Sequence, residues 1–306
     1  MGEPQTLEWQ VGDLRVVRIA ETDLVLPYDP ERPVLAEATP EALRGMGWLE
    51  PNFIDENASL LLSVHTFAIE AKDQRIVVDT CFGNDKPSAL LGHEALQTNF
   101  LDRLDAAGFP RDAVDVVLCT HLHVDHVGWN TMLHPDLTAG ADPQWIPTFP
   151  NAQYLFGRAE LEHWQTTEAK HQVPVMRDSV TPILEAGLER LVEMDEQITP
   201  EIGLRPTPGH TPGHVSVVLQ SGSESAVITG DVFHHPCQIT EPSWCLPFDG
   251  DKAMASATRK EFVERAVESG DLILGTHFPA PTAGRIVRDE DGSCRLHSSS
   301  TRPAEP

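Results

Sequence analysis

Residues 117–129 read VLCTHLHVDHVGW and place four side chains of metal-binding type within six residues: His121, His123, Asp125 and His126. The apolar run Val114–Cys119 at the start of this stretch is typical of a buried strand, so the four side chains emerge where the chain leaves a sheet. Alternation along an extended backbone sends His121 and His123 to one side, while the following turn lets Asp125 and His126 face a neighbouring point. The spacing favours two adjacent metal ions over a solvated polar turn, because imidazoles this close crowd each other without a metal.

Three more apolar runs lie beside residues of the same types. TPGHTPGH at 207–214 precedes a strand-like run, VITGD at 227–231 ends in a carboxylate, and LILGTH at 272–277 ends in a histidine. Together, four strand ends offer five histidines and two carboxylates. That set is large enough for a site with two metal ions and a carboxylate that bridges them.

These motifs resemble the ordered motif set of the metallo-β-lactamase superfamily: THxHxDH at 120–126, GH at 209–210, GD at 230–231 and GTH at 275–277. The resemblance runs from about residue 60 to residue 288. It implies the αβ/βα sandwich, with two β-sheets face to face and helices on both outer sides. The implied metal ligands are His121, His123 and His210 for one ion, Asp125, His126 and His277 for the other, and Asp231 as the bridge.

The expected catalytic residues are Asp125, Asp231 and His234. His234 stands three residues after Asp231, where many acyl-homoserine lactonases have a tyrosine that assists the substrate carbonyl. A hydrogen bond to the substrate or leaving group and packing as a polar core residue are both open for it. Asp79 resembles a buried carboxylate that orients a metal histidine, with a surface position as the alternative. His214 aligns with a variable position of the family, which implies that it supports the ligands or has a structural role and is not itself a ligand.

Short β-branched runs predict strands, and longer amphipathic segments predict helices between them. The expected strands cover residues 14–20, 60–69, 75–79, 114–119, 153–156, 214–219, 226–229 and 272–274. The expected helices cover residues 94–107, 159–164 and 252–268, the last with Met254, Phe262, Val263 and Val267 on one face. This order indicates an α/β or α+β sandwich. We predict one domain over residues 1–306, with a Pro-rich covering arm or extra packed segment at 21–58 and a frayed tail at 289–306.

The composition excludes several classes of partner. Lys and Arg number 22 against 47 Asp and Glu, which gives a formal charge of −25. A surface this negative repels phosphate backbones and anionic headgroups, so we expect neither a nucleic acid nor a membrane as partner. Residues 1–20 lack the basic and apolar segments of a signal peptide, and no window approaches the ~20 apolar residues of a membrane span. The expected location is the cytoplasm.

Two divalent ions would hold a bridging hydroxide that attacks an electrophilic carbonyl carbon or phosphorus. Ligation rich in histidine favours zinc, with iron, manganese and cobalt as alternatives. Within the superfamily, the chain is most similar to the group of acyl-homoserine lactonases and methyl parathion hydrolase. That similarity lies in GDVFHH at 230–235, GTHFPAPTAGRI at 275–286 and FPNAQYLF at 149–156. It implies hydrolysis of a lactone or carboxylic ester, with side activity on phosphotriesters.

Other branches of the superfamily fit less well. Most di-zinc β-lactamases lack the bridging aspartate, and nuclease branches need a basic surface that this acidic chain does not have. Two alternatives stay open: a thioester hydrolase of the glyoxalase II type and, further away, a mononuclear iron dioxygenase. Metal analysis separates the dioxygenase from the hydrolases.

Substrate recognition is expected from aromatic side chains in loops beside the ligand motifs. The predicted pocket residues are Trp129, Phe82, Phe233 and Phe278, with core packing as the alternative for each. Apolar and aromatic walls favour a small neutral organic substrate. The family resemblance is also consistent with a homodimer.

Overall fold

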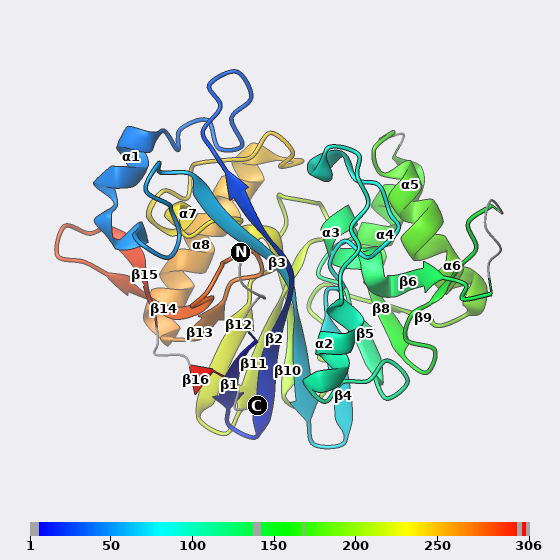
Figure 1. Cartoon of the computed structure of the whole chain (residues 1–306). Coiled ribbons are helices and arrows are strands. Elements are labelled where there is room, and N and C mark those ends of the chain that lie inside the picture. Colours follow the sequence, from blue (N-terminus) through cyan, green and yellow to red (C-terminus); the bar gives the residue numbers. More distant parts are fainter. Residues whose placement is uncertain (1–5, 137–141, 168, 299–301, 304–306) are drawn as a thin grey trace.

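Two β-sheets pack face to face, and helices cover their outer sides (Figure 1). This computed structural model describes residues 6–136, 142–167, 169–298 and 302–303. The apolar cluster between the sheets contains side chains from both, with Phe67 and Leu118 from one sheet and Val217 and Leu274 from the other. The predicted sandwich of two sheets flanked by helices is confirmed.

The first sheet has the strand order β16-β1-β2-β3-β4-β5-β8-β9. Its strands are β1 (Leu7–Val11), β2 (Leu14–Leu26), β3 (Leu60–Ala71), β4 (Gln74–Val78), β5 (Val116–Leu118), β8 (Gln153–Gly157), β9 (Glu189–Val192) and β16 (Arg302–Pro303). Neighbours from β1 to β4 are antiparallel, whereas β4, β5, β8 and β9 are parallel. The parallel strands end at one edge of the sheet, and the histidine-rich stretch leaves β5 at that edge.

The second sheet has the order β10-β11-β12-β13-β14-β15. Its strands are β10 (Ile202–Pro206), β11 (Val215–Ser221), β12 (Glu224–Ile228), β13 (Leu272–Leu274), β14 (Ala283–Arg288) and β15 (Cys294–Ser298). The pair β12–β13 is parallel, so the segments that follow these two strands leave the sheet at the same edge. A small third sheet pairs β6 (Thr131–Leu133) with β7 (Trp145–Pro147).

The helices differ in length and in how they are capped. They are α1 (Pro40–Gly45), α2 (Phe100–Ala106), α3 (Val124–Val127), α4 (Arg158–Thr166), α5 (Val173–Val175), α6 (Thr181–Ala186), α7 (Cys237–Thr240) and α8 (Lys252–Ser269). Helical turns of other types cover Gly47–Leu49, Ala89–Leu91, Gly128–Asn130, Met176–Val180 and Gly230–Val232. The side chain of Asp251 caps the start of α8 by accepting the Met254 amide at 2.9 Å, and Gly270 ends the helix in a left-handed conformation.

Two predicted helical features are wrong. The helix expected over 94–107 begins only at Phe100, because backbone bridges and the Asn84 side chain hold residues 94–98 against residues 84–88. On α8, Met254 is 46% exposed, whereas Arg259 takes a buried place beside Phe262. Among the described residues, no helix combines the length and apolarity needed to cross a membrane.

The segment predicted as a covering arm over 21–58 has two parts. Residues 21–26 complete β2, so the arm itself starts at residue 27. Beyond it, Leu35, Leu43 and Phe53 are buried in the core on the outer face of the second sheet, together with residues of α7 and α8. The arm is therefore packed along much of its length.

The frayed tail predicted over 289–306 is wrong for its first part. Residues 294–298 form β15, which pairs antiparallel with β14, and Cys294 and Leu296 are buried. Burial of these alternate side chains favours a strand although the segment is rich in polar residues. Residues 299–301 and 304–306 lie outside the described part of the chain.

Candidate metal centre

The seven predicted ligands meet at the edge shared by the two sheets. Four of them lie on the segment that leaves β5 and enters the single turn of α3. His210 lies in the turn before β11, Asp231 follows β12, and His277 follows β13. Their side chains form two groups: His121, His123, His210 and Asp231, and Asp125, His126 and His277.

In the first group, three ring nitrogens and one carboxylate oxygen converge. Nδ1 of His123 lies 3.0 Å from Nε2 of His121 and 2.8 Å from Nε2 of His210. Oδ2 of Asp231 lies 3.6 Å from Nε2 of His121 and 3.3 Å from Nε2 of His210. These four atoms can therefore face a single ion.

In the second group, the other oxygen of Asp231 takes part. Oδ1 of Asp231 lies 3.2 Å from Nε2 of His126 and 3.1 Å from Nε2 of His277. The carboxylate of Asp125 lies 3.7 Å from the former nitrogen and 3.6 Å from the latter. Asp231 thus presents one oxygen to each group, as the bridging role predicted from the sequence requires.

The donor atoms fit a pair of divalent ions. Nε2 of His126 and Oδ1 of Asp231 are buried 3.2 Å apart, and within the described part of the chain neither atom has a well-formed hydrogen bond, which is costly unless a metal ion satisfies them. Burial lowers the pKa of His121 and of His123 well below the ordinary value, so both imidazoles are neutral as metal ligation requires. Histidine nitrogens with carboxylate oxygens are a donor set that zinc accepts.

Asp79 occupies the orienting position predicted for it. Its Oδ2 accepts Nδ1–H of His126 at 2.9 Å, which directs Nε2 of that ring toward the other ligands. The Thr120 amide donates to Oδ1 at 2.8 Å, and the Thr120 hydroxyl donates to Oδ2 at 2.9 Å. The aspartate is only 1% exposed, so the alternative of a surface position is excluded.

His214 holds the backbone of the bridging aspartate. Its Nε2 accepts the Asp231 amide at 2.7 Å, and its Nδ1 donates to the Thr207 carbonyl at 3.0 Å. Burial lowers the pKa of His214 to about 3, which keeps the ring neutral. Gly230, at φ +55°, is required beside it, because a Cβ there would lie 2.5 Å from Nε2 of His214.

His214→Ala is expected to weaken the site far less than His210→Ala. The first change removes a hydrogen bond to the Asp231 backbone and should lower kcat/KM about 10- to 100-fold, as for other residues that orient ligands. The second removes a ligand, so we expect loss of one bound ion and nearly all activity. Elemental analysis and kcat/KM on both variants measure the difference. Equal losses would mean that the two histidine roles are assigned wrongly.

Glu160 of α4 ties two ligand segments together behind the first group. Its Oε1 accepts from the Leu122 amide at 3.2 Å and the Trp164 indole at 2.6 Å. Its Oε2 accepts from the Thr211 hydroxyl at 2.7 Å and the Gly213 amide at 3.1 Å. Position 213 requires glycine, because a Cβ there would lie 2.3 Å from the Glu160 backbone nitrogen. The carboxylate therefore fixes the segment after β5 against the turn before β11.

Glu21, at the bulge of β2, holds the far end of the histidine-rich stretch. Its carboxylate accepts from the Phe82 amide at 2.8 Å, the Gly83 amide at 3.2 Å and the Trp129 indole at 2.6 Å. Burial raises the pKa of Glu21 to about 7.

The sequence analysis missed three residues that hold the ligand segments: Glu21, Glu160 and Asp249, the last of which contacts His210. The sequence offered one signal for Glu21: an acidic residue directly follows the predicted strand at 14–20.

The aromatic side chains predicted to line the substrate pocket are buried in the core. They are Phe82, Trp129, Phe233 and Phe278. Trp129 stacks on Phe100 with ring centroids 5.8 Å apart, and the other three are at most 1% exposed. All four belong to apolar core clusters, which is the alternative that the sequence left open for each of them.

His234 and Phe248 instead lie beside the ligands. Nε2 of His234 is 3.0 Å from Oδ2 of Asp231, and its ring stacks on His277 with centroids 5.6 Å apart. Phe248 is 45% exposed and meets the rings of His234 and His210 edge-on, with centroids 5.7 and 6.0 Å apart. These two side chains are the candidates for substrate contact at the first group.

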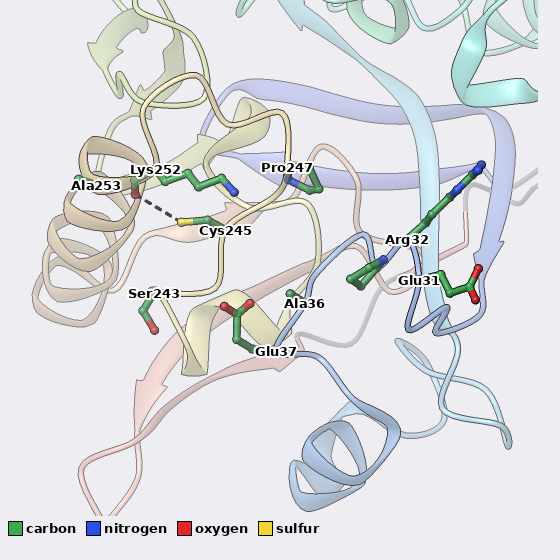
Figure 2. A pocket seen from close by; sticks show the side chains of 10 residues that line it. Glu31, Arg32, Ala36, Glu37, Ser243, Cys245, Pro247, Lys252 and Ala253 are labelled. Carbon is green, nitrogen blue, oxygen red and sulfur yellow. Dashed lines mark hydrogen bonds between the residues drawn. The ribbon is translucent and has the colours of Figure 1, made fainter.

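A separate cavity of about 630 Å³ lies between the arm and the loop before α8 (Figure 2). Its charged lining residues are Glu31, Arg32, Glu37 and Lys252. None of the seven candidate ligands lines it. The cavity therefore does not mark the metal centre.

Comparison with known proteins gives a family and several relatives. The model of the metallo-beta-lactamase superfamily matches residues 60–277. An N-acyl homoserine lactonase of Bacillus thuringiensis is 25% identical over 224 residues, which cover 67% of this chain and 78% of the relative. An N-acyl homoserine lactonase of Bacillus cereus is 24% identical over 218 residues, with the same two coverages of 67% and 78%.

Solved structures show the same fold. The hydrolase AbOPH of the beta lactamase superfamily has a TM-score of 0.77 and 21% identity, and the match covers 98% of this chain and 100% of that one. AidC, described as a dizinc quorum-quenching lactonase, has a TM-score of 0.76 and 19% identity, with coverages of 97% and 98%. At these identities the likeness establishes the architecture.

Proposed function

Because this chain belongs to the metallo-beta-lactamase superfamily, we propose that it is a binuclear metal-dependent hydrolase that opens a lactone or cleaves a carboxylic ester. The observation that carries the proposal is the placement of Asp231, whose two oxygens face two separate groups of ligands. A carboxylate in this position suits two ions rather than one. The relatives named as N-acyl homoserine lactonases support the lactone in particular.

The proposed cofactors are two divalent metal ions, with zinc first and iron, manganese or cobalt as alternatives. When bound, such ions lower the pKa of a water molecule and take up negative charge that develops on the substrate oxygen. His121, His123 and His210 would hold one ion, Asp125, His126 and His277 the other, and Asp231 both. The second group also argues against the mononuclear iron dioxygenase, which has no use for three further ligands.

His234 is proposed to hydrogen-bond the substrate carbonyl or the leaving group. Nδ1 of its buried ring has no hydrogen-bond partner among the described residues, and Nε2 lies 3.0 Å from Oδ2 of Asp231. Burial lowers the pKa of His234, so its ring is neutral and carries one N–H to donate. Asp125 is partly exposed, with 14% of its side chain accessible, and can pass a proton between the site and solvent as the alcohol leaves.

The proposed substrate is a small neutral organic molecule. A formal charge of −25 disfavours anionic substrates, and Phe248 offers an exposed apolar face next to His210 and His234. Side activity on phosphotriesters follows from the same chemistry, because phosphorus is also an electrophile. A homodimer and a cytoplasmic location stay predictions from the sequence.

A substrate panel tests this function. The protein is stripped of metal, reconstituted with zinc, cobalt or manganese, and assayed with lactones, aryl esters, S-acyl thioesters and phosphotriesters. We expect the highest kcat/KM on a lactone or ester and a much lower value on phosphotriesters. The Asp231→Ala variant serves as the control for background hydrolysis. A highest value on thioesters would move the assignment to the glyoxalase II type, and no turnover of any class would refute the hydrolase.

A further inference from the structure

His210 differs from the other histidines of the first ligand group in how it is supported. His121 and His123 lie on the short segment between β5 and α3, whereas His210 is isolated in the turn before β11. The ring of His210 instead forms a hydrogen bond with a residue that is distant in the sequence. Its Nδ1 donates to Oδ1 of Asp249 at 3.0 Å, which leaves the lone pair of Nε2 to face the first ligand group.

Asp249 is itself held on its other oxygen. Oδ2 accepts the Leu246 amide at 3.0 Å and lies 3.4 Å from Nη2 of Arg259. The Arg259 side chain, from α8, is 1% exposed and also donates to the Pro242 carbonyl at 2.9 Å and to Sγ of Cys245 at 2.8 Å. Figure 2 shows Cys245 beside Lys252, whose carbonyl oxygen is 3.3 Å from the thiol sulfur. The Asp249 side chain is fully buried, so it has little freedom to turn.

The backbone of residues 249–251 also hydrogen-bonds to the backbone around His210. The Gly250 amide donates to the His210 carbonyl at 3.0 Å, and the Asp251 amide donates to the Gly209 carbonyl at 2.9 Å. Gly209 lies so close to α8 that a Cβ there would be 2.3 Å from the Ala255 backbone nitrogen. Residues 249–251 therefore fix both the ring and the main chain of this ligand.

A buried Arg–Asp pair gives little net stability, because the free energy of removing both charges from water offsets their attraction. A well-packed apolar pair would serve the core at least as well. The contact of Asp249 with a ligand ring supplies the missing reason for the charges: the carboxylate must stay fixed and ionised to accept the ring N–H.

We propose that Asp249, held in place by Arg259, is the positioning residue of the first metal site, where it fixes the orientation and tautomer of His210. Asp79 does the equivalent for His126 in the second site, so each site has its own orienting carboxylate. The proposal rests on the proposed metal centre but not on the identity of the substrate. Its consequence is that the two sites can be weakened separately.

The test is a zinc titration of metal-free protein against a chromophoric chelator, for wild type, Asp249→Asn and Asp79→Asn. We expect each variant to bind one of the two ions about 10- to 100-fold more weakly and the other ion as wild type does. The double variant should be weakened at both steps. Arg259→Met, which leaves Asp249 in place, should shift the same step as Asp249→Asn by a smaller factor.

Asp271→Asn is the matched control. Asp271 is a buried aspartate that accepts from the Ser225 hydroxyl, and it precedes β13 at the end of the strand opposite to His277. The control should bind both ions like wild type, even if its apo-protein melts at a lower temperature. Wild-type affinity at both steps in Asp249→Asn would overturn the proposal, as would an equal weakening of both steps. Absence of ester or lactone hydrolysis in a wild-type protein that binds two ions would refute the proposed function alone.

Discussion

Asp231→Ala is expected to abolish hydrolysis, with a fall in kcat/KM of about 1,000-fold or more. The two oxygens of this side chain face both ligand groups, so its removal leaves each group one donor short. Stabilisation of transition-state charge by such ions amounts to several kcal/mol, and each 1.4 kcal/mol corresponds to a factor of about ten in rate. Steady-state assays and elemental analysis of the purified variant measure both effects, and we expect fewer than two ions per chain.

The fold should survive this change. The backbone amide of Asp231 donates to Nε2 of His214 at 2.7 Å, and this hydrogen bond remains whatever the side chain is. Far-UV circular dichroism of Asp231→Ala should therefore match wild type, and Asp271→Asn controls for loss of a buried aspartate elsewhere. Wild-type activity in Asp231→Ala, with the substitution verified, is incompatible with a two-metal mechanism.

The candidate ligands could be found from the sequence because their motifs stand at strand ends and resemble those of a known family. Four lie within residues 121–126, and each of the others adjoins a short apolar strand in a Gly-containing motif. A strand end fixes the direction of the next few side chains, so a small pattern already carries three-dimensional information. Strands β4 and β5 pair in parallel, and so do β12 and β13. Within each pair the two strands therefore end at the same edge of the sheet, which brings the motifs together.

The residues that orient the ligands could not be predicted in the same way. Asp249 is 39 positions from His210, and Glu160 is 38 positions from Leu122 and 53 from Gly213. These contacts depend on the packing of α4 and α8 against the sheets, which no local periodicity encodes. Arg259 shows the same limit, since a helical pattern assigns an arginine to solvent while the structure buries it against Asp249.

Apolar patterns were also ambiguous where a long-range contact decides the outcome. Residues 94–98 continue the helical spacing of Phe100–Ala106, yet the bridge between Ser88 and Glu94 holds them in an extended form. The aromatic residues after the ligand motifs could equally line a pocket or fill the core, and the sandwich needs them in its core. Composition and spacing do not separate these two uses of the same side chain.

Removal of metal is expected to eliminate activity and to lower the melting temperature by roughly 10 °C or more. The seven ligand side chains are prearranged in the folded state, so ions bind the native chain and stabilise it by mass action. At a free-metal concentration 1,000 times the dissociation constant, each ion contributes about 4 kcal/mol. For a domain of this size, 1 kcal/mol corresponds to about 2–4 °C in melting temperature. Thermal scans with chelator and with added zinc measure the shift.

The stoichiometry of recovery distinguishes the mechanisms that the ligand geometry allows. If both groups bind metal, activity should return only as the second equivalent of zinc, cobalt or manganese is added, because both candidate ligand groups would then hold an ion. Asp231→Ala should show neither the full thermal shift nor this recovery. Complete recovery with one equivalent, or one iron per chain with uptake of oxygen, would instead point to a mononuclear centre built on His121, His123, His210 and Asp231, and would leave the second group without a catalytic role.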